Sequence, residues 1–528
     1  MLPPTAPTTH KAAQLPPLIR ALLSDPVCYD HAVEGVQLIE THISWVLLTG
    51  VYAYKIKKPV NLGFLDFSTL ALRQRACADE VRLNQRLAAE TYLGVVAIAG
   101  NADAPQVNGP GEPIEHAVKM RQFPLDAALD HMDERGELGD AQIDQLAVRL
   151  AQFHLGECAR TPADSPWGEP DAIAQPVAEN FQLLASRLDD PAESQCLAAL
   201  HDWCSAEHVR LTPLMRERKR NGWVRECHGD LHLGNIAWVN EQILIFDCIE
   251  FSTALRWIDV ISEVAFCFMD LLHRNHRDLA MRFLNGWLEA SGDYAGVPLL
   301  RYYAVYRALV RAKVAVLRAG QVDGSDAGAS RAEVSACLRL AENLSQNMPA
   351  QLWITHGLSG SGKTTLTQLL LQEHGMIRLR SDVERKRLVG LDVLAHSGGE
   401  AGGLYTQEAD RRTYTHLAHL AETLLDAGWT VIVDAACLAR WQRDMFREIA
   451  QRRDVCFRIL DIQADHATLR ERITRRAAQG TDASEADLRV LQQQIETMQP
   501  LGTDELAEVT RISGTTALAP KFHLQLTV

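Results

Sequence analysis

Residues 352–373 read LWITHGLSGSGKTTLTQLLLQE, and the loop from Gly357 to Thr364 matches the pattern G-x-x-x-x-G-K-[ST] in full. The apolar run Leu352–Thr355 predicts a buried strand before the loop, and Thr365–Glu373 predicts a helix after it. The glycines let backbone N–H groups turn inward around phosphate oxygens, and the helix start adds the positive end of its dipole. The stretch therefore predicts a phosphate-binding loop within an α/β unit.

This loop supplies a set of candidate nucleotide ligands that lie next to one another in the sequence. They are Gly357, Leu358, Ser359, Gly360, Ser361, Gly362, Lys363, Thr364 and Thr365. Lys363 is expected to reach the β- and γ-phosphates and to act in catalysis, and the Thr364 hydroxyl is expected to ligate Mg²⁺. Asp434 ends the apolar stretch VIVDA and is a second candidate metal ligand, with a helix-capping role as the alternative.

After Pro349 the predicted elements follow the order strand, glycine-rich turn, helix, which is typical of an α/β domain. This change of pattern places a domain boundary near 346–350. It predicts a domain with a parallel sheet over residues 350–528. The preceding domain, 27–346, is β-rich to about residue 123 and mainly helical from about 124. Residues 1–26 are predicted to form a flexible arm with a short helix near Leu18–Leu23, and Gln321–Ser330 a loop between helices.

Composition narrows the class of protein. The chain has 528 residues and a formal net charge of −14, which argues against a nucleic-acid coat or a polybasic membrane binder. Its eleven cysteines form no C-x-x-C pair, so neither a disulfide framework nor a zinc cluster is predicted. The absence of a secretory signal pattern and of a long uncharged apolar run predicts a cytoplasmic protein without a spanning helix.

A second polar constellation lies in CHGDLHLGNIAWVNEQILIFDCIEF, residues 227–251. It contains Asp230 and Asn235, followed by an apolar strand that ends at Asp247. Further upstream, Ser44–Gly50 and Val51–Lys57 predict a β-hairpin, and Ser68–Ala89 predicts a helix capped by Ser68.

The HGDLHLGN segment with Asp247 resembles the H-G-D-x-x-x-x-N loop and metal-binding aspartate of aminoglycoside phosphotransferases. The resemblance implies an α+β, bilobal, protein-kinase-like fold for the first domain. It also implies that Asp230 is catalytic and positions or deprotonates an acceptor hydroxyl, while Asn235 and Asp247 hold Mg²⁺.

The stretch Tyr52–Lys55 resembles the V-A-I-K strand of kinases, which implies that Lys55 contacts the α- and β-phosphates and that Glu80 is its ion-pair partner. Lys57 lies on the same face of the predicted strand and is the alternative phosphate ligand. The glycine-rich loop of protein kinases is absent between the first two strands. The Thr41 and Ser44 hydroxyls, or the turn amides, would have to hold the phosphates there.

The second domain resembles small-molecule and polynucleotide P-loop kinases, and also zeta-toxin-like kinases. This resemblance implies that Asp382 is the base and that Arg385 contacts the acceptor, with a solvated turn as the alternative. The segment 469–476 is similar to the arginine-bearing lid of these kinases, so Arg472 is a candidate phosphate ligand; Arg475 and Arg476 are its alternatives, and a solvated helix face is the other interpretation.

The arrangement over roughly residues 30–510 resembles a bacterial family that joins an aminoglycoside-phosphotransferase-like domain to a P-loop ATP-binding kinase domain. This implies two sites that use ATP and Mg²⁺ to transfer a γ-phosphoryl group to a hydroxyl of a small molecule. One alternative leaves catalysis to the P-loop domain, as a small-molecule or polynucleotide 5′-hydroxyl kinase, and makes the first domain a binding or regulatory module. Another is a nucleotide-gated interaction protein. The expected partners are a nucleotide and a small hydroxyl-bearing acceptor, with no membrane; the chain's acidity disfavours a nucleic-acid partner.

Overall fold

The computed structural model describes residues 15–63, 65–320, 325–392, 395, 406–479 and 483–513. The chain divides into two compact units. The first unit comprises Met1–Asp270 and Tyr302–Glu342, and the second comprises Leu271–Arg301 and Asn343–Val528. The boundary near 346–350 stays a prediction, but the segment Leu271–Arg301, which the sequence placed in the first domain, belongs to the second compact unit.

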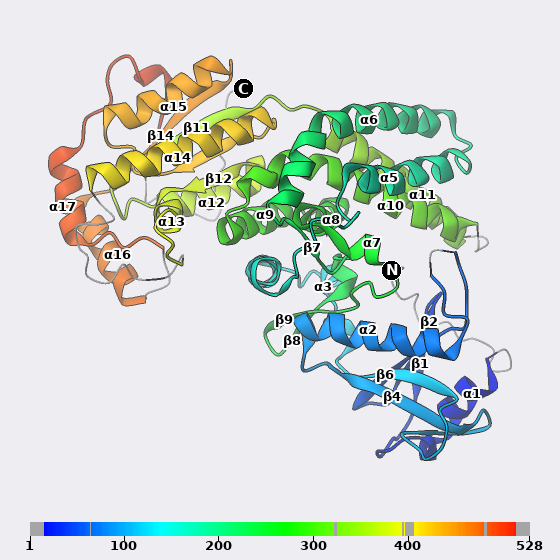
Figure 1. Cartoon of the computed structure of the whole chain (residues 1–528). Helices are drawn as coiled ribbons and strands as arrows, with labels where there is room; N and C mark the ends of the chain where they lie inside the picture. The colour runs from blue at the N-terminus through cyan, green and yellow to red at the C-terminus, as the bar shows by residue number, and fades with distance from the viewer. Residues whose placement is uncertain are drawn as a thin grey trace. The chain divides into compact units, whose positions relative to one another are not determined.

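The first unit begins with a six-stranded antiparallel sheet in the order β1-β2-β3-β6-β4-β5. Its strands are β1 (Gln37–Glu40), β2 (Ser44–Leu48), β3 (Tyr52–Lys57), β4 (Tyr92–Asn101), β5 (Ala104–Val107) and β6 (Glu115–Arg121). The predicted hairpin is confirmed, since β2 and β3 pair with Val46 opposite Lys55. Helix α2 (Leu70–Ala88) packs on β4 and β6 (Figure 1). Its N-cap is Thr69, which accepts from Leu72 N, and not Ser68.

The short helix predicted near Leu18–Leu23 is confirmed, but it packs into a core and is not part of a flexible arm. Helix α1 (Pro17–Ser24) buries Ile19 and Leu22 completely against apolar side chains of the sheet, such as Leu47. Burial of two aliphatic side chains is worth several kcal/mol, which is enough to hold so short a helix in place. Residues 1–14 lie outside the described residues.

The rest of the first unit is mainly helical. Its helices are α3 (Leu129–Glu134), α4 (Asp140–Gln152), α5 (Pro170–Ala185), α6 (Pro191–Arg220), α7 (Thr253–Arg256), α8 (Val260–His273), α10 (Leu300–Ala319) and α11 (Ser325–Ser345). Helices α8 and α10 lie mostly, but not entirely, in this unit. Two short antiparallel ribbons accompany them, β7 (Val224–Glu226) with β10 (Trp257–Asp259), and β8 (Ile236–Val239) with β9 (Gln242–Ile245). The predicted loop at 321–330 is wrong from Ser325 onward, because α11 begins there.

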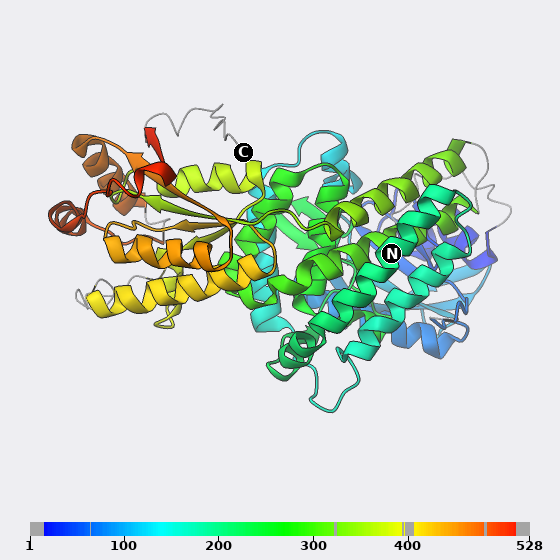
Figure 2. The ribbon, with the colours of Figure 1, turned by 90° about the horizontal axis from the view of Figure 1, so that it is seen from above.

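The second unit is built on a five-stranded parallel sheet in the order β12-β13-β11-β14-β15. The strands are β11 (Gln351–His356), β12 (Ile377–Arg380), β13 (Val431–Asp434), β14 (Cys456–Gln463) and β15 (Val509–Ser513). Its helices are α9 (Arg277–Ser291), α12 (Lys363–His374), α13 (Ser381–Arg387), α14 (Gln407–Asp426), α15 (Arg440–Arg452), α16 (His466–Gln479) and α17 (Leu488–Thr497). Figure 2 shows α14 and α15 along one face of this sheet and α12 along the other. The predicted combination of fold classes is confirmed.

Helix α9 joins the second unit through buried polar contacts as well as packing. Asn285 accepts from Arg378 N at 2.7 Å and donates to Met376 O at 3.0 Å, so it continues the hydrogen bonding at the start of β12. Glu289 pairs with Arg378 at 3.1 Å and with Arg380 at 2.6 Å. Helix α9 is therefore an integral part of this α/β layer. None of the described helices has both the length and the apolar content needed to cross a bilayer.

Candidate active sites

In the first unit, the two strand lysines share one carboxylate from α2. Lys55 Nζ lies 2.8 Å from Glu80 Oε1 and 2.5 Å from Asp247 Oδ1. Lys57 pairs with the other oxygen of Glu80 and with Glu250, and it is completely buried. The structure thus brings Lys55, Glu80 and Asp247 together, as the sequence predicted. Lys57 shares Glu80 with Lys55 but is completely buried, with Glu250 as its second partner.

These contacts set the charge states of the cluster. Burial alone would lower the pKa of Lys55, but Asp247 and Glu80 outweigh it and hold that pKa well above its usual value. Burial would likewise raise the pKa of Glu80, but Lys55 and Lys57 lower it to about 2. Both lysines therefore remain ammonium ions at neutral pH, which is the form that binds phosphate.

The loop after β7 is shaped by His228. Its Nε2 bonds Phe246 O at 2.8 Å, and its Nδ1 accepts from Asp230 N at 3.2 Å. Burial lowers the pKa of His228, which fits a neutral ring that donates from one nitrogen and accepts at the other. Asn235 Nδ2 donates to Asp230 O at 2.9 Å and to Asp230 Oδ2 at 3.2 Å. The two predicted site residues thus lie in direct contact.

Asp247 has a backbone conformation that is uncommon for a residue with a side chain, with φ at 65°. Its N–H donates to the Tyr92 hydroxyl at 3.1 Å, and the next residue, Cys248, donates to Asn84 Oδ1 at 2.9 Å. These contacts hold the strained turn in place, so the carboxylate faces Lys55. Backbone strain of this kind is concentrated at functional sites.

A cavity of about 170 Å³ lies beside this cluster. Lys55, Asn235, Asp247 and Thr41 line it, together with the segment from Met120 to Phe123 at the end of β6. Much of the remaining wall is apolar, from Ile39, Val46, Leu48, Ala53 and Phe246. An apolar cavity that is also lined by a lysine and an aspartate has the polarity expected of a site for a nucleoside and its phosphates.

In the second unit, the glycines of the phosphate loop are required by close packing. Gly357 and Gly360 have φ values of 153° and 83°. A Cβ at Gly357 would lie 2.6 Å from Ile462 O, and one at Gly360 would lie 3.0 Å from Leu469 O. Helix α12 begins at Lys363, two residues before the predicted start, so the loop leads directly into the helix N-terminus.

Lys363 and Thr364 stand at one end of a cavity of about 730 Å³. Lys363 Nζ donates to Gly357 O at 3.0 Å and to Leu358 O at 2.9 Å. Burial lowers the pKa of Lys363, although Asp434 and Asp382 oppose the shift. Asp434 is buried at the end of β13 and accepts from the Thr367 hydroxyl at 3.2 Å. The Thr364 hydroxyl and the Asp434 carboxylate are oxygen donors of the kind that Mg²⁺ prefers.

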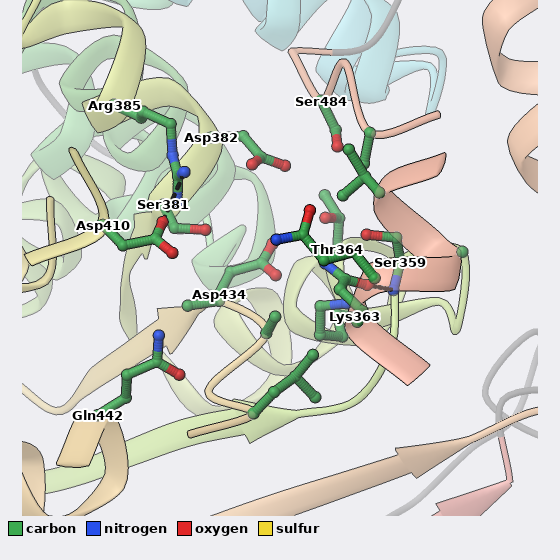
Figure 3. Close-up of a pocket in the computed structure, with 18 of the residues that line it drawn as sticks. Ser359, Lys363, Thr364, Ser381, Asp382, Arg385, Asp410, Asp434, Gln442 and Ser484 are labelled. Carbon is green, nitrogen blue, oxygen red and sulfur yellow. Dashed lines mark hydrogen bonds and ion pairs between the residues drawn. The ribbon is translucent and has the colours of Figure 1, made fainter. Parts of the chain in front are cut away.

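The other wall of this cavity carries the predicted acceptor residues. Figure 3 shows the side chains of Asp382, Arg385 and Asp434 reaching the same space as Lys363 and Thr364. Arg385 is largely buried and pairs with Asp410 at 2.7 Å. Arg472 Nη1 donates to Gly360 O at 3.3 Å and to Ser361 O at 3.4 Å, so it rests on the phosphate loop. Arg475 and Arg476 line the cavity too.

Comparisons with known proteins place the chain in a family. The protein Rv2004c of Mycobacterium tuberculosis (strain ATCC 25618 / H37Rv) is 32% identical over 476 residues, which are 87% of this chain and 91% of that protein. This chain belongs to the same family. A family model described as an AAA domain matches residues 352–501, which contain the phosphate loop and its cavity.

Two solved structures align with different parts of the chain. The choline/ethanolamine kinase family protein from Mesorhizobium loti is 10% identical and covers 63% of this chain and 96% of that one, with a TM-score of 0.37. The gluconokinase from Sinorhizobium meliloti is 18% identical and covers 33% and 86%, with a TM-score of 0.24. The predicted fusion of a phosphotransferase-like domain with a P-loop domain is confirmed by the chain's own sheets and by the AAA-domain match.

Several residues of the two sites were not predicted from the sequence. In the first unit, Glu250 neutralises Lys57, and Tyr92 and Asn84 fix the turn at Asp247. In the second unit, Thr367 contacts Asp434, and Gln494 accepts from Ser359 N at 2.9 Å. Only Glu250 carried a usable signal, because a carboxylate three residues after Asp247 in an apolar stretch requires a buried partner.

Proposed function

We propose that this protein is an ATP- and Mg²⁺-dependent phosphotransferase with two kinase-type sites, each of which transfers a γ-phosphoryl group to a hydroxyl of a small molecule. The observation that carries the proposal is the cavity of about 730 Å³ in the second unit. Lys363, Thr364, Asp434 and Asp382 all line it. It thus combines a phosphate ligand, two oxygen donors for a metal and a carboxylate for the acceptor.

In the second unit, the loop amides and Lys363 would hold the phosphates while Asp382 orients the acceptor hydroxyl and takes its proton. In the structure, the ammonium group of Lys363 donates to carbonyl oxygens of the phosphate loop. Triphosphate oxygens are stronger hydrogen-bond acceptors for this group than backbone carbonyls are. Arg472, Arg475 and Arg476 would add positive charge where negative charge builds up. Mg²⁺, when bound by Thr364 and Asp434, supplies further neutralisation of the phosphates.

In the first unit, Lys55 would bind phosphate, and Asp230 would position or deprotonate the acceptor hydroxyl. Glu80 holds Lys55 in place. Asn235 and Asp247 carry the oxygen donors that fit Mg²⁺, and both line the cavity that holds Lys55.

The test is phosphoryl transfer from γ-labelled ATP into a metabolite extract. It compares the full chain with Asp230→Asn, Asp382→Asn and the double variant. We expect each single variant to lose a different labelled product and the double variant to lose both. Arg387→Gln is the control for the second site, because Arg387 pairs with Glu384 and Glu289 O and does not line the cavity. Equal labelling by wild type and both single variants would contradict the proposal.

A second candidate function is favoured by the size of the first cavity. At about 170 Å³ it lies below the usual range of roughly 300–1,000 Å³ for small-molecule sites. Thr41 is also committed to its turn, because its hydroxyl accepts from Ser44 N at 2.9 Å. On this reading the first unit is a binding or regulatory module, and only the P-loop site transfers phosphate.

The two functions differ in what the first unit does with ATP. In a full chain that carries Lys363→Ala, the two-site proposal expects a remaining ATP site that Lys55→Met or Asp247→Asn weakens. Isothermal titration calorimetry with Mg·ATP measures it. Binding that persists without any Asp230-dependent product favours the module, and absence of binding removes the first site from the proposal.

A further inference from the structure

Three ligand-type side chains meet below the loop at 228–235, outside both cavities. They are His154, Cys227 and Glu263, and all three are completely buried. One potential ligand atom from each lies within 4.8 Å of the other two. The imidazole, thiol and carboxylate come from three separate segments of the first unit, so the tertiary fold alone assembles them.

The spacing inside this cluster is informative. His154 Nε2 lies 3.3 Å from Glu263 Oε2. A charge-assisted N–H···O bond is shorter, about 2.7–2.9 Å. Two ligands at about 2.0–2.1 Å from one tetrahedral ion stand about 3.3 Å apart. The observed separation is that of a long hydrogen bond, and it also equals the spacing of two ligands on one tetrahedral ion, so the pair could hold an ion without moving apart.

The backbone around His154 has an uncommon form. Residues Phe153–Glu157 make a π-helical turn, η4, directly after α4. Single π-helical turns are rare and occur often at functional sites, because they rotate one side chain out of the α-helical register. Arg225 supports this turn, since its Nη1 donates to His154 O and, at 3.1 Å, to Leu155 O. The turn thus directs His154 toward Cys227 and Glu263.

We propose that His154, Cys227 and Glu263 form a structural zinc site that fastens the loop carrying Asp230. One nitrogen, one sulfur and one oxygen ligand suit Zn²⁺, and complete burial matches the closed character of structural zinc sites. Binding forms Zn–N, Zn–S and Zn–O bonds and releases the thiol proton of Cys227. The bound ion, one thiolate and one carboxylate sum to zero charge, which suits an apolar interior.

The site acts on the loop through two direct connections. Cys227 precedes His228 in the chain, and Glu263 accepts from His228 N at 2.7 Å through Oε1 and at 3.0 Å through Oε2. His228 in turn holds Asp230 N and Phe246 O. A carboxylate has enough lone pairs to bind both a metal and this N–H group. The ion would thus fix the position of the loop without contact with either proposed substrate.

The test measures metal content and ligand identity in the full chain. All proteins carry Cys456→Ser, which removes the one exposed cysteine among the eleven. After incubation with Zn²⁺ and dialysis against a weak chelator, mass spectrometry of the metal should give about one zinc per chain. Cys227→Ser and His154→Gln should each reduce it at least fivefold. Cys204→Ser, at a buried cysteine of α6, should keep it.

Replacement of zinc by Co²⁺ gives a readout that does not depend on the variants folding well. Wild-type chain loaded with Co²⁺ should show the near-ultraviolet thiolate-to-cobalt charge-transfer band, and Cys204→Ser should retain it. Less than 0.1 zinc per chain in the wild type, absence of that band, or unchanged zinc in Cys227→Ser would each overturn the proposal. A zinc-dependent rise in the melting temperature of wild type, absent in His154→Gln, would support it.

Discussion

At the scale of single residues, the structure distinguishes the surroundings of two lysines of the first site, which the sequence could not do. Lys55 and Lys57 lie on the same face of β3 and share Glu80. Only Lys55 lines the cavity, whereas Lys57 is completely buried between Glu80 and Glu250. The same type of side chain therefore lines a cavity in one case and is buried between two carboxylates in the other.

Replacement of each lysine should have a different consequence. Lys55→Met is expected to reduce Asp230-dependent transfer about 10²–10³-fold, the range for loss of one group that stabilises developing charge. Lys57→Met should instead destabilise the fold by about 3–5 kcal/mol, because Glu250 loses its buried partner. Urea unfolding and labelled-ATP assays on both variants distinguish the effects. If Lys55→Met loses much stability while Lys57→Met keeps its transfer activity, only the assignment of Lys55 is contradicted. If Lys57→Met loses transfer activity and Lys55→Met loses only stability, the two roles are exchanged.

The buried, neutral His228 predicts a pH dependence of stability. Burial lowers its folded-state pKa, so the unfolded chain binds more protons and the free energy of unfolding should fall as pH drops below about 6.5. His228→Asn should show a flatter dependence between pH 7.5 and 5 in urea unfolding. His201→Asn, at an exposed histidine, should keep the wild-type slope. Equal slopes for wild type and His228→Asn would show that His228 is not the titrating group.

At the scale of elements, one helix from the middle of the chain completes the α/β sheet. Helix α9 contacts α12 and β12, and its Glu289 pairs with both arginines of β12. Arg378 also lies within 3.5 Å of the Thr367 hydroxyl, which contacts Asp434. A chain of polar contacts thus runs from α9 to the proposed metal ligand of the second site.

Removal of the Glu289 charge should affect both stability and the second site. Glu289→Gln removes the carboxylate that pairs with both Arg378 and Arg380, at a cost of about 3 kcal/mol or more. Asp382-dependent transfer should fall while Asp230-dependent transfer does not. Asp278→Asn in the exposed first turn of α9 is the control and should cost less than about 1 kcal/mol. Chemical denaturation and the two product assays measure this, and an unchanged unfolding curve would refute the structural role of Glu289.

At the scale of the whole molecule, the second compact unit is discontinuous in sequence. Its two parts, Leu271–Arg301 and Asn343–Val528, flank a segment of the first unit. Leu279, Phe283, Trp287 and Leu288 of α9 are buried, so they supply core that the later segment lacks by itself. Neither compact unit can therefore be isolated by a single cut.

A fragment that starts at the predicted boundary tests this arrangement. Residues 350–528 alone should be poorly folded, with exposed apolar surface, reduced helical circular dichroism and binding of an apolar fluorescent dye. Addition of residues 271–301 through a flexible linker should restore a cooperative thermal transition. A cooperative transition in the short fragment alone would show that α9 is dispensable.

Much of the local structure followed from the sequence. The phosphate loop, the strand before it and the helix after it were predicted because glycine spacing and an apolar run are local signals. The β2–β3 hairpin and the contact of Lys55 with Glu80 were predicted too. The packing of α1 was missed because it depends on sheet residues distant in the chain. The cap at Thr69, a local hydrogen bond from Leu72 N one residue past the predicted Ser68, and the helical start of α11 were missed as well.

The sequence by itself determined which chemical groups are present and the local loops that carry them: the Lys363 loop, the segment from His228 to Asn235, and Asp247 at the end of its strand. Only the tertiary structure decided which of these groups share a cavity, that Lys57 is buried with Glu250, that α9 belongs to the second unit, and that His154 meets Cys227 and Glu263. The physical reason is the distance along the chain over which each effect acts. Backbone conformation and amphipathic pattern are set by residues a few positions apart, whereas burial and charge pairing depend on packing between segments far apart in the chain.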